Sequence, residues 1–296
     1  MATSKNVHIS WFGGEPTLCT SIILEMSSFI QKLQKRYKFK YDANMTTNGY
    51  LLDCESFQQY YKAGINAYQI TLDGWNHDVT RPHVSGNGTL KTILENLKSV
   101  SSLPEEYQFH VTIRHNILDG DQDFSWYDFL YDQFGTDARF SVAVVPVNDW
   151  GGETVKKLNI LKRNKKQVLQ TVHEEYLDKI GMRREGKVKL PFSDICYASC
   201  PRGFIFRADG KVEKCSIALN HPKNQVGVIH AENGVILDES ACKLWCTSDL
   251  KTECLTCNDV LSCLNICCRK VIIVDGRTES VCLCKTLTDK RERVSE

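Results

Sequence analysis

The residues best suited to chemistry in this sequence are its cysteines, which gather in the last third of the chain. Of the 14 cysteines, only Cys19 and Cys54 precede position 196. In a chain of 296 residues without a secretory signal, this density favours metal binding over disulfides. Thiolate ligands with no histidine among them are typical of iron–sulfur clusters or zinc, and the spacing does not distinguish these metals.

The spacing of the first cysteines predicts one four-cysteine site. Nine residues, Gly210 and four further residues separate Cys200 from Cys215. A hairpin around residues 209–211 would return Cys215 toward Cys200, so that both sulfurs reach one centre. Cys196 precedes Cys200 by four positions and is included in this set.

A second site is expected from the later cysteines. Cys254 and Cys257 form a CxxC pair, which places two sulfurs on one tight turn. Cys263 and Cys267 follow, and either Cys282 or Cys284 closes the set. The remaining cysteines are interpreted as packing or loop thiols, with the first two expected to be buried: Cys19, Cys54, Cys242, Cys246 and Cys268.

The composition excludes several function classes. With 37 basic and 36 acidic side chains, the net charge of +1 gives no electrostatic case for nucleic acid or an anionic membrane. The chain is 42% hydrophobic, too apolar for disorder, and contains no apolar run near the roughly 18 residues of a membrane span. No signal peptide opens the sequence, so we expect a cytoplasmic protein with reduced thiols.

Before the cysteines, strand-like and helix-like segments alternate. Apolar, β-branched runs predict five strands: 7–12, 41–47, 67–72, 109–117 and 139–147. Helical spacing of apolar residues predicts the helices between and after them: 22–33, 57–63, 90–100, 124–134 and 158–180. This alternation indicates an α/β fold with a parallel sheet and right-handed crossovers.

Polar motifs follow these strands where each one ends. They are Gly13-Gly14-Glu15, Thr46-Thr47-Asn48-Gly49, Thr71-Leu72-Asp73-Gly74 and Arg114. Because ligand sites of parallel sheets lie at the carboxyl ends of the strands, these motifs should converge there. A domain boundary is expected near residues 187–192, which gives domains 1–190 and 191–296.

Two motif sets resemble one known family. The cysteine spacing is similar to that of the SPASM domain found in many radical S-adenosylmethionine (radical SAM) enzymes. Independently, Gly13-Gly14-Glu15-Pro16, Thr46–Gly49 and Gln69–Gly74 with His77, Asp78 and Arg81 resemble the strand-end motifs of the radical SAM barrel. The resemblance implies a partial (β/α)6 barrel that lacks its first strand and helix, followed by a small SPASM domain.

The resemblance also implies ligand sets for two auxiliary 4Fe-4S clusters. Cys196, Cys200, Cys215 and Cys267 would hold the first, and Cys254, Cys257, Cys263 and Cys284 the second.

The resemblance further implies a site for S-adenosylmethionine in the complete enzyme. Backbone at Gly13 and Gly14 would approach the cofactor, and the Glu15 carboxylate would accept hydrogen bonds from its ammonium group. Thr71 would bind the ribose, Arg114 the methionyl carboxylate, and Thr46 would contribute to the same site.

One feature of the family is missing from the sequence. The catalytic cluster of radical SAM enzymes is held by CxxxCxxC upstream of the position of Gly13, and this sequence contains no such motif. We therefore expect an N-terminally truncated enzyme that does not cleave S-adenosylmethionine alone.

The function that the resemblance implies is hydrogen abstraction by a 5′-deoxyadenosyl radical during peptide maturation. The alternatives are a sulfatase-maturing type, disfavoured by Ser216 after Cys215, and a non-catalytic electron-carrying or binding partner; a zinc-bound structural remnant is a third reading. A precursor peptide or protein substrate, and an electron donor such as flavodoxin or ferredoxin, would be the partners. No catalytic residue is assigned, since Asp73, His77 and Asp194 are more often structural.

Overall fold

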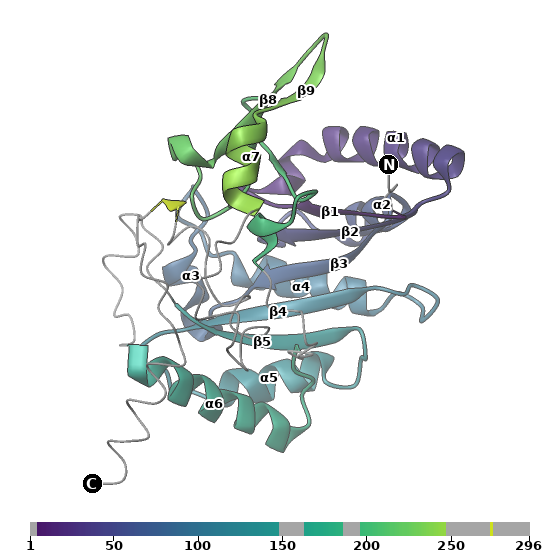
Figure 1. Cartoon of the computed structure of the whole chain (residues 1–296). Coiled ribbons are helices and arrows are strands. Elements are labelled where there is room, and N and C mark those ends of the chain that lie inside the picture. The colour runs from purple at the N-terminus through teal and green to yellow at the C-terminus, as the bar shows by residue number, and fades with distance from the viewer. Residues whose placement is uncertain (1–4, 148–162, 186–195, 247–272, 275–296) are drawn as a thin grey trace, which may run out of the picture. The chain divides into compact units, whose positions relative to one another are not determined.

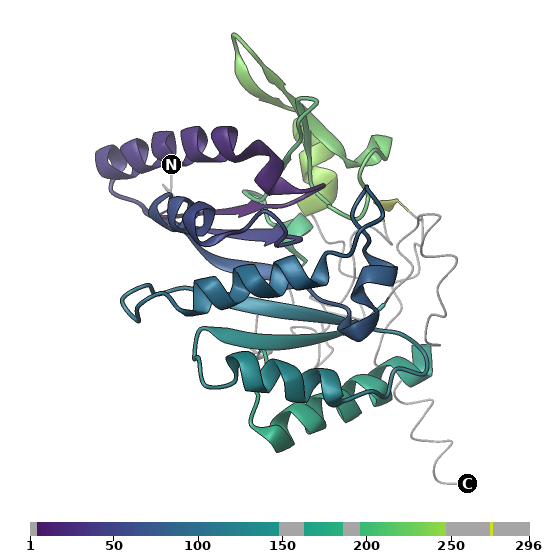
Figure 2. The same ribbon diagram turned by 180° about the vertical axis from the view of Figure 1, so that it is seen from behind.

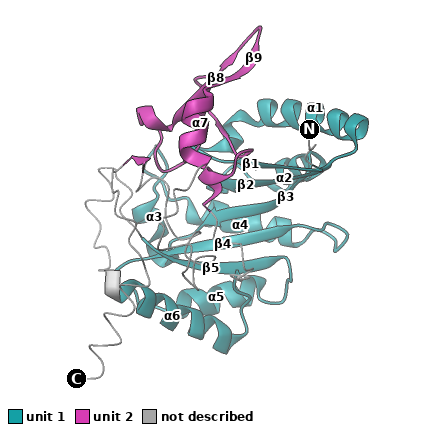
Figure 3. Ribbon diagram, viewed as in Figure 1, with its two compact units in different colours: residues 1–186 teal, residues 187–296 magenta. Residues whose placement is uncertain are grey.

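The computed structural model describes residues 5–147, 163–185, 196–246 and 273–274. The chain divides into two compact units, residues 1–186 and 187–296, which are described separately (Figure 3). No helix in these described ranges is long and apolar enough to cross a membrane.

Unit 1 is built on a five-stranded sheet in the order β1-β2-β3-β4-β5, and every neighbouring pair is parallel (Figure 1). The strands are β1 (Asn6–Trp11), β2 (Lys40–Thr47), β3 (Ile65–Thr71), β4 (His110–Ile117) and β5 (Phe140–Pro146). The predicted five-stranded parallel sheet is therefore confirmed, with strand ends shifted by no more than a few residues.

Helices lie between the strands of unit 1 and after the last strand. They are α1 (Thr20–Tyr37), α2 (Cys54–Lys62), α3 (His77–Thr80), α4 (Leu90–Ser101), α5 (Ser125–Phe134) and α6 (Arg163–Ile180). Helices α2, α4 and α5 lie across one face of the sheet (Figure 2). The expected helices are present, although the beginning of the one predicted over 158–180 falls partly outside the described residues. The short helix α3 was not predicted.

The two faces of the sheet differ in chemistry because side chains alternate along each strand. On one face, Met45, Ile70 and Ile113 are buried in the core beneath the helices. On the other face, register places polar residues side by side: Gln69 pairs with Thr112, which in turn pairs with Ser141. The helix-covered face supplies the apolar core, and the opposite face presents polar side chains.

A short extended segment continues the sheet beyond β5. The Val142 N–H donates to the carbonyl of Arg183, and the Glu185 N–H donates to the carbonyl of Val142, both at 2.9 Å. The Glu185 Oε2 atom accepts hydrogen bonds from Thr112 Oγ1 (2.8 Å), His110 Nε2 and Ser141 Oγ (both 3.0 Å). Glu185 thus joins the polar face of β4 and β5 to the chain that follows α6.

Unit 2 contains a four-stranded antiparallel sheet and one helix longer than a single turn among its described residues. These are β6 (Ile205–Phe206), β7 (Lys211–Glu213), β8 (Gln225–His230), β9 (Gly234–Leu237) and α7 (Glu239–Cys246). The Arg207 N–H donates to the Lys211 carbonyl at 3.0 Å, and Gly210 has a φ of +81°, a conformation that favours glycine. The hairpin predicted around residues 209–211 is therefore confirmed.

Candidate functional site

The motif loops of unit 1 meet at the carboxyl edge of the sheet. Glu15 follows β1, Asn48 follows β2, Asp73 follows β3, and Leu118 begins the loop after β4. All strands run in the same direction, so these loops lie at one edge. This is the edge where parallel α/β sheets bind ligands.

Glu15 ties the loop after β1 to the end of β2. Its Oε1 atom accepts hydrogen bonds from Thr47 Oγ1 (2.5 Å), Thr17 Oγ1 (2.7 Å) and the Thr17 N–H (3.1 Å). Its Oε2 atom accepts one from the Asn48 N–H at 2.7 Å. Oε1 is therefore saturated, whereas Oε2 keeps a lone pair for a ligand donor.

Gly13 and Gly14 have φ angles of +93° and +55°, where a residue with a side chain is strained. Both are exposed, and a Cβ atom built on either would meet no atom within 4 Å. The glycine pair is thus required by backbone conformation, and open space lies beside it.

Thr46 and Thr71 lie near the carboxyl ends of neighbouring strands. Thr46 is exposed and pairs with Gln69, whereas the next residue, Thr47, is buried and binds Glu15. Thr71 is half-buried and pairs with Arg114 on β4. Of the six predicted cofactor residues, Gly13, Gly14 and Glu15 thus lie in the loop after β1, and the other three lie on successive strands of the sheet: Thr46 on β2, Thr71 on β3 and Arg114 on β4.

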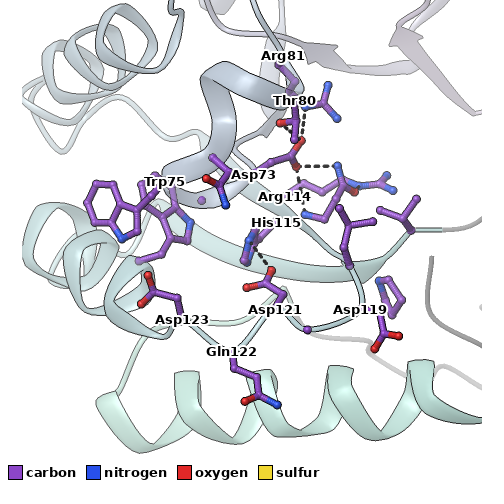
Figure 4. A pocket seen from close by; sticks show the side chains of 18 residues that line it. Asp73, Trp75, Thr80, Arg81, Arg114, His115, Asp119, Asp121, Gln122 and Asp123 are labelled. Atoms are coloured by element: carbon purple, nitrogen blue, oxygen red, sulfur yellow. Dashed lines mark hydrogen bonds and ion pairs between the residues drawn. The ribbon is translucent and has the colours of Figure 1, made fainter. Parts of the chain in front are cut away.

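A pocket of about 870 Å³ opens at the ends of β3, β4 and β5 (Figure 4). Of the predicted cofactor residues, only Arg114 lines it. The lining also includes Asp73, Gly74, Trp75, Asn76, Thr80, Arg81, His115, Asn116, Leu118, Asp119, Gly120, Asp121, Gln122, Asp123, Trp126, Pro146 and Val147.

Asp73 organises one wall of the pocket (Figure 4). Its Oδ2 atom accepts a hydrogen bond from Arg81 Nε at 2.6 Å and one from Thr80 Oγ1 at 3.3 Å. Its Oδ1 atom accepts one from Asn116 Nδ2 at 3.0 Å. The carboxylate is therefore engaged on both oxygens, consistent with a structural part for Asp73.

Arg114 presents a guanidinium group to the pocket. Its Nε–H donates to Asn116 Oδ1 at 2.9 Å, and within the described residues its two terminal nitrogens make no hydrogen bond. Burial, together with the positive charge of Arg81, lowers the pKa of Arg114, while Asp73 opposes this shift. The terminal nitrogens remain available as a fork for a carboxylate.

In unit 2, three of the predicted metal ligands are described. Cys215 is buried, Cys196 is half-buried and Cys200 is exposed. Within the described ranges, no three His, Cys, Asp or Glu side chains are close enough together to hold a metal ion. The remaining predicted ligands, and the alternative Cys282, lie outside the described residues: Cys254, Cys257, Cys263, Cys267 and Cys284.

The turn that carries Cys215 is firmly anchored. Asn224 is fully buried; its Oδ1 accepts from the Cys215 N–H (2.9 Å) and its Nδ2 donates to the Cys215 carbonyl (2.8 Å). The buried Lys214 Nζ donates to the carbonyls of Cys200 (2.6 Å) and Gly203 (2.7 Å). These bonds bring the backbone segments of Cys200 and Cys215 together, as the predicted hairpin requires.

The structure also tests two cysteines that were predicted to be packing or loop thiols, Cys19 and Cys242. Cys19 is exposed at the end of the 3-10 helix Pro16–Cys19, so the prediction that it is a buried packing residue is wrong. It sits where α1 begins, which places its side chain outside the core. Cys242 is partly buried against the apolar cluster of unit 2, as predicted for a packing thiol.

The sequence interpretation missed several pocket residues. His115 and Asp121 were not singled out. Outside the pocket, Thr47, which binds Glu15, was passed over in favour of its neighbour Thr46. The loop of residues 119–123, with three aspartates in five positions, was the available signal for a functional loop after β4. The sequence contained no signal that His115 is functional, since its hydrogen-bond partners come from helices that are distant in the sequence.

Comparisons with known proteins agree with this geometry. Residues 3–130 match the family model of the Radical SAM superfamily. A search of the curated proteins found no match. Among solved structures, native anSMEcpe with bound AdoMet and Cp18Cys peptide has a TM-score of 0.61 at 15% identity, covering 90% of this chain and 78% of that one.

Streptococcus suis SuiB is also similar in fold. SuiB bound to its precursor peptide SuiA has a TM-score of 0.56 at 14% identity, and SuiB bound to S-adenosylmethionine has 0.54 at 15%. Each alignment covers 93% of this chain and 63% or 64% of SuiB. The chain thus spans less than two thirds of the length of SuiB.

Proposed function

We propose, from the radical SAM domain that residues 3–130 form, that this chain belongs to a radical S-adenosylmethionine enzyme that modifies a peptide or protein. The observation that carries the proposal is the gathering of the matched motif loops at the edge of the sheet where the pocket opens. We propose further that the enzyme is of the peptide-maturase type. Its partial barrel would end and its SPASM domain would begin near residue 190.

The residues at this edge fit the amino acid part of S-adenosylmethionine. Arg114 would bind the carboxylate through its terminal nitrogens, and Glu15 Oε2 would accept a hydrogen bond from the ammonium group. The open backbone at Gly13 and Gly14 would lie against the cofactor, with Thr71 and Thr46 contributing hydroxyl groups. When bound, the cofactor and a reducing iron–sulfur cluster would supply the radical that abstracts hydrogen from substrate.

The ligands of the catalytic cluster are not among these residues. The sequence contains no CxxxCxxC motif, so we propose that cofactor cleavage requires thiolates from outside the 296 residues. What the chain itself would contribute is the binding of the cofactor, the pocket and the auxiliary metal sites.

The chemistry around Lys214 fits an anionic metal site in unit 2. Its ammonium group is buried and donates to two carbonyls, and within the described residues it forms no ion pair. A buried cation favours a nearby anion, and clusters held by four thiolates are anionic. Cys196, Cys200, Cys215 and Cys267 would hold one 4Fe-4S cluster, and Cys254, Cys257, Cys263 and Cys284 the other.

Two observations support a peptide substrate. Both anSMEcpe and SuiB, which are similar in fold, have been solved with bound peptides. The pocket is roomy and is lined by two tryptophans beside charged groups, a surface suited to amino acid side chains. The resemblance to radical SAM enzymes, from which the clusters are proposed, also leads us to propose an external one-electron donor such as flavodoxin or ferredoxin.

The test is the metal content and cofactor affinity of the anaerobically reconstituted chain. We expect about eight irons and eight sulfides per chain, with about half lost in Cys215→Ala and none lost in the control Cys19→Ala. Zinc without sulfide would contradict the cluster assignment.

Affinity for S-adenosylmethionine is measured by anaerobic equilibrium dialysis. Arg114→Met removes a charge-assisted pair and should weaken binding roughly ten- to hundredfold. Arg36→Met, on the exposed end of α1 next to the amino edge of β2, is the matched control. Equal affinity of the two variants would overturn the assignment of Arg114.

A further inference from the structure

Three buried side chains form a hydrogen-bonded chain behind the pocket. His115 on β4, Tyr127 on α5 and His173 on α6 are at most 2% exposed. The Tyr127 hydroxyl lies 2.8 Å from His115 Nδ1 and 2.7 Å from His173 Nδ1. At its far end, His173 Nε2 lies 3.0 Å from the backbone carbonyl of Asp121.

The carbonyl at the far end fixes the direction of every hydrogen bond in this chain. A carbonyl only accepts, so His173 Nε2 must carry a proton, and in a neutral ring His173 Nδ1 is then an acceptor. Tyr127 has one proton, which it donates to His173 Nδ1. The Tyr127 oxygen must therefore accept from His115 Nδ1–H, which leaves His115 Nε2 without a proton.

The groups around this chain favour neutral rings. Burial lowers the pKa of His115 to about 4, with His173 acting in the same direction and Asp73 opposing. Burial also lowers the pKa of His173, although the Asp121 carbonyl and carboxylate oppose this shift. Burial raises the pKa of Tyr127, reinforced by Asp121 and Glu174, so the phenol keeps its proton.

The unprotonated nitrogen faces the pocket. His115 is among the lining side chains. The dashed line between His115 and Asp121 in Figure 4 marks a distance of 3.5 Å from Nε2 to Oδ2, which is an ion pair only if the ring is protonated and is long for a hydrogen bond to a neutral ring. On another side lies Gly74, where a Cβ atom would stand 3.5 Å from Nε2. Burial and the negative charge of Asp123 raise the pKa of Asp121, whereas His173 opposes this shift.

We infer that Tyr127 and His173 hold His115 in the tautomer that presents a bare Nε2 to the pocket, where it accepts a hydrogen bond from an N–H or O–H group of the bound ligand. The ligand part rests on the proposed function, since it requires that the pocket bind substrate or cofactor. The tautomer does not, because it follows from hydrogen bonds within unit 1.

Nitrogen-15 NMR of the chain with labelled histidine tests the tautomer directly. Eight histidines give a tractable spectrum, and the His115 signals are identified by their loss in His115→Gln. We expect His115 to be neutral near pH 7, with its proton on Nδ1. A proton on Nε2, in either a neutral or a charged ring, would overturn the inference whether or not the chain is a radical SAM enzyme.

Paired substitutions of His173 test the relay. His173→Gln retains a donor and an acceptor, so His115 should keep its proton on Nδ1. His173→Leu removes both; Tyr127 then donates to His115 Nδ1, and the His115 proton should move to Nε2. If both variants behave alike, Tyr127 and His173 do not position His115.

Tyr127→Phe provides a second variant should His173→Leu not fold. It removes the hydroxyl oxygen that accepts from Nδ1–H, so the His115 proton should move from Nδ1 to Nε2.

Adding S-adenosylmethionine distinguishes the source of the donor. A change of the His115 Nε2 resonance at saturating cofactor assigns the donor to S-adenosylmethionine, and an unchanged resonance assigns it to the peptide. In the active assembly, loss of this hydrogen bond in His115→Phe should weaken binding of that ligand roughly tenfold. Unchanged affinity for both ligands would overturn the role of His115 as an acceptor.

Discussion

Glu15 and Thr47 join the first two strands of unit 1 by a hydrogen bond of 2.5 Å between a carboxylate oxygen and a hydroxyl group. Thr47 is 5% exposed, so its hydroxyl has little access to water as an alternative partner. The same Thr47 oxygen accepts a hydrogen bond from the Gly49 N–H at 3.1 Å. One carboxylate thereby orders both loops that border the proposed cofactor site.

Replacing Glu15 should therefore destabilise unit 1 even without a ligand. Glu15→Ala leaves the Thr47 hydroxyl and the Thr17 hydroxyl without their acceptor, which costs about 1–3 kcal/mol of unfolding free energy. Denaturant unfolding followed by circular dichroism measures the loss. Glu25→Ala, on the exposed face of α1, should change stability by less than about 0.5 kcal/mol. An unfolding midpoint for Glu15→Ala equal to that of the control would show that the tie contributes nothing.

The sequence predicted the sheet well because buried parallel strands appear as continuous apolar runs. The strand Phe140–Pro146 is the clearest case, since nearly all of it is buried. The helix His77–Thr80 was missed because it spans only four residues, too few to show helical periodicity.

The site was predictable from the sequence where the residue types of a motif restrict the local backbone conformation. Glycine at positions 13 and 14 is required by positive φ angles, and the glycine pair that indicates such a conformation can be read directly from the sequence. The partner of Glu15 was not predictable, because two adjacent threonines give no indication of which faces the core. His115 was missed because Tyr127 lies 12 positions away and His173 a further 46. Such pairings exist only once the helices are packed.

Glu185 should make stability depend on pH in the acid range. Burial alone would raise the pKa of Glu185, but hydrogen bonds from Thr112, His110 and Ser141 together lower it below its ordinary value of 4.5. A carboxyl group with a lowered folded-state pKa stabilises the fold above its unfolded-state pKa. That contribution is lost as pH falls through the lower, folded-state value.

The unfolding free energy of the wild type should thus decline below about pH 4.5 more steeply than that of Glu185→Gln. Chemical unfolding at several pH values between 7 and 3 compares the two proteins. Parallel curves would mean that the hydrogen bonds to Glu185 do not favour its charged form.

Asn224 should control the order of the turn that carries Cys215. Its side chain bonds the N–H groups of Lys214 and Cys215 and the carbonyls of Cys215 and Ala218. Asn224→Ala removes all four bonds from a fully buried position, so the Cys215 amide should exchange with solvent more than about tenfold faster. Hydrogen exchange resolved by residue measures this, and the amides of β4 serve as an internal control. Acceleration in both units alike would indicate global destabilisation rather than loss of this anchor.

Removing the charge of Lys214 should reduce iron retention more than removing the charge of the nearby exposed Lys211. Lys214→Met keeps the length and apolar stem of the side chain but removes the ammonium group, leaving the carbonyls of Cys200 and Gly203 without a donor. If thiolate-held clusters lie beside it, their negative charge loses a buried counter-charge, so iron should dissociate faster under a chelator. Lys211→Met, whose side chain is 41% exposed and pairs with Asp209, is the matched control. The expected result is faster iron loss for Lys214→Met at unchanged secondary structure. Equal iron loss from the two variants would show that the buried ammonium serves only to join the two carbonyls.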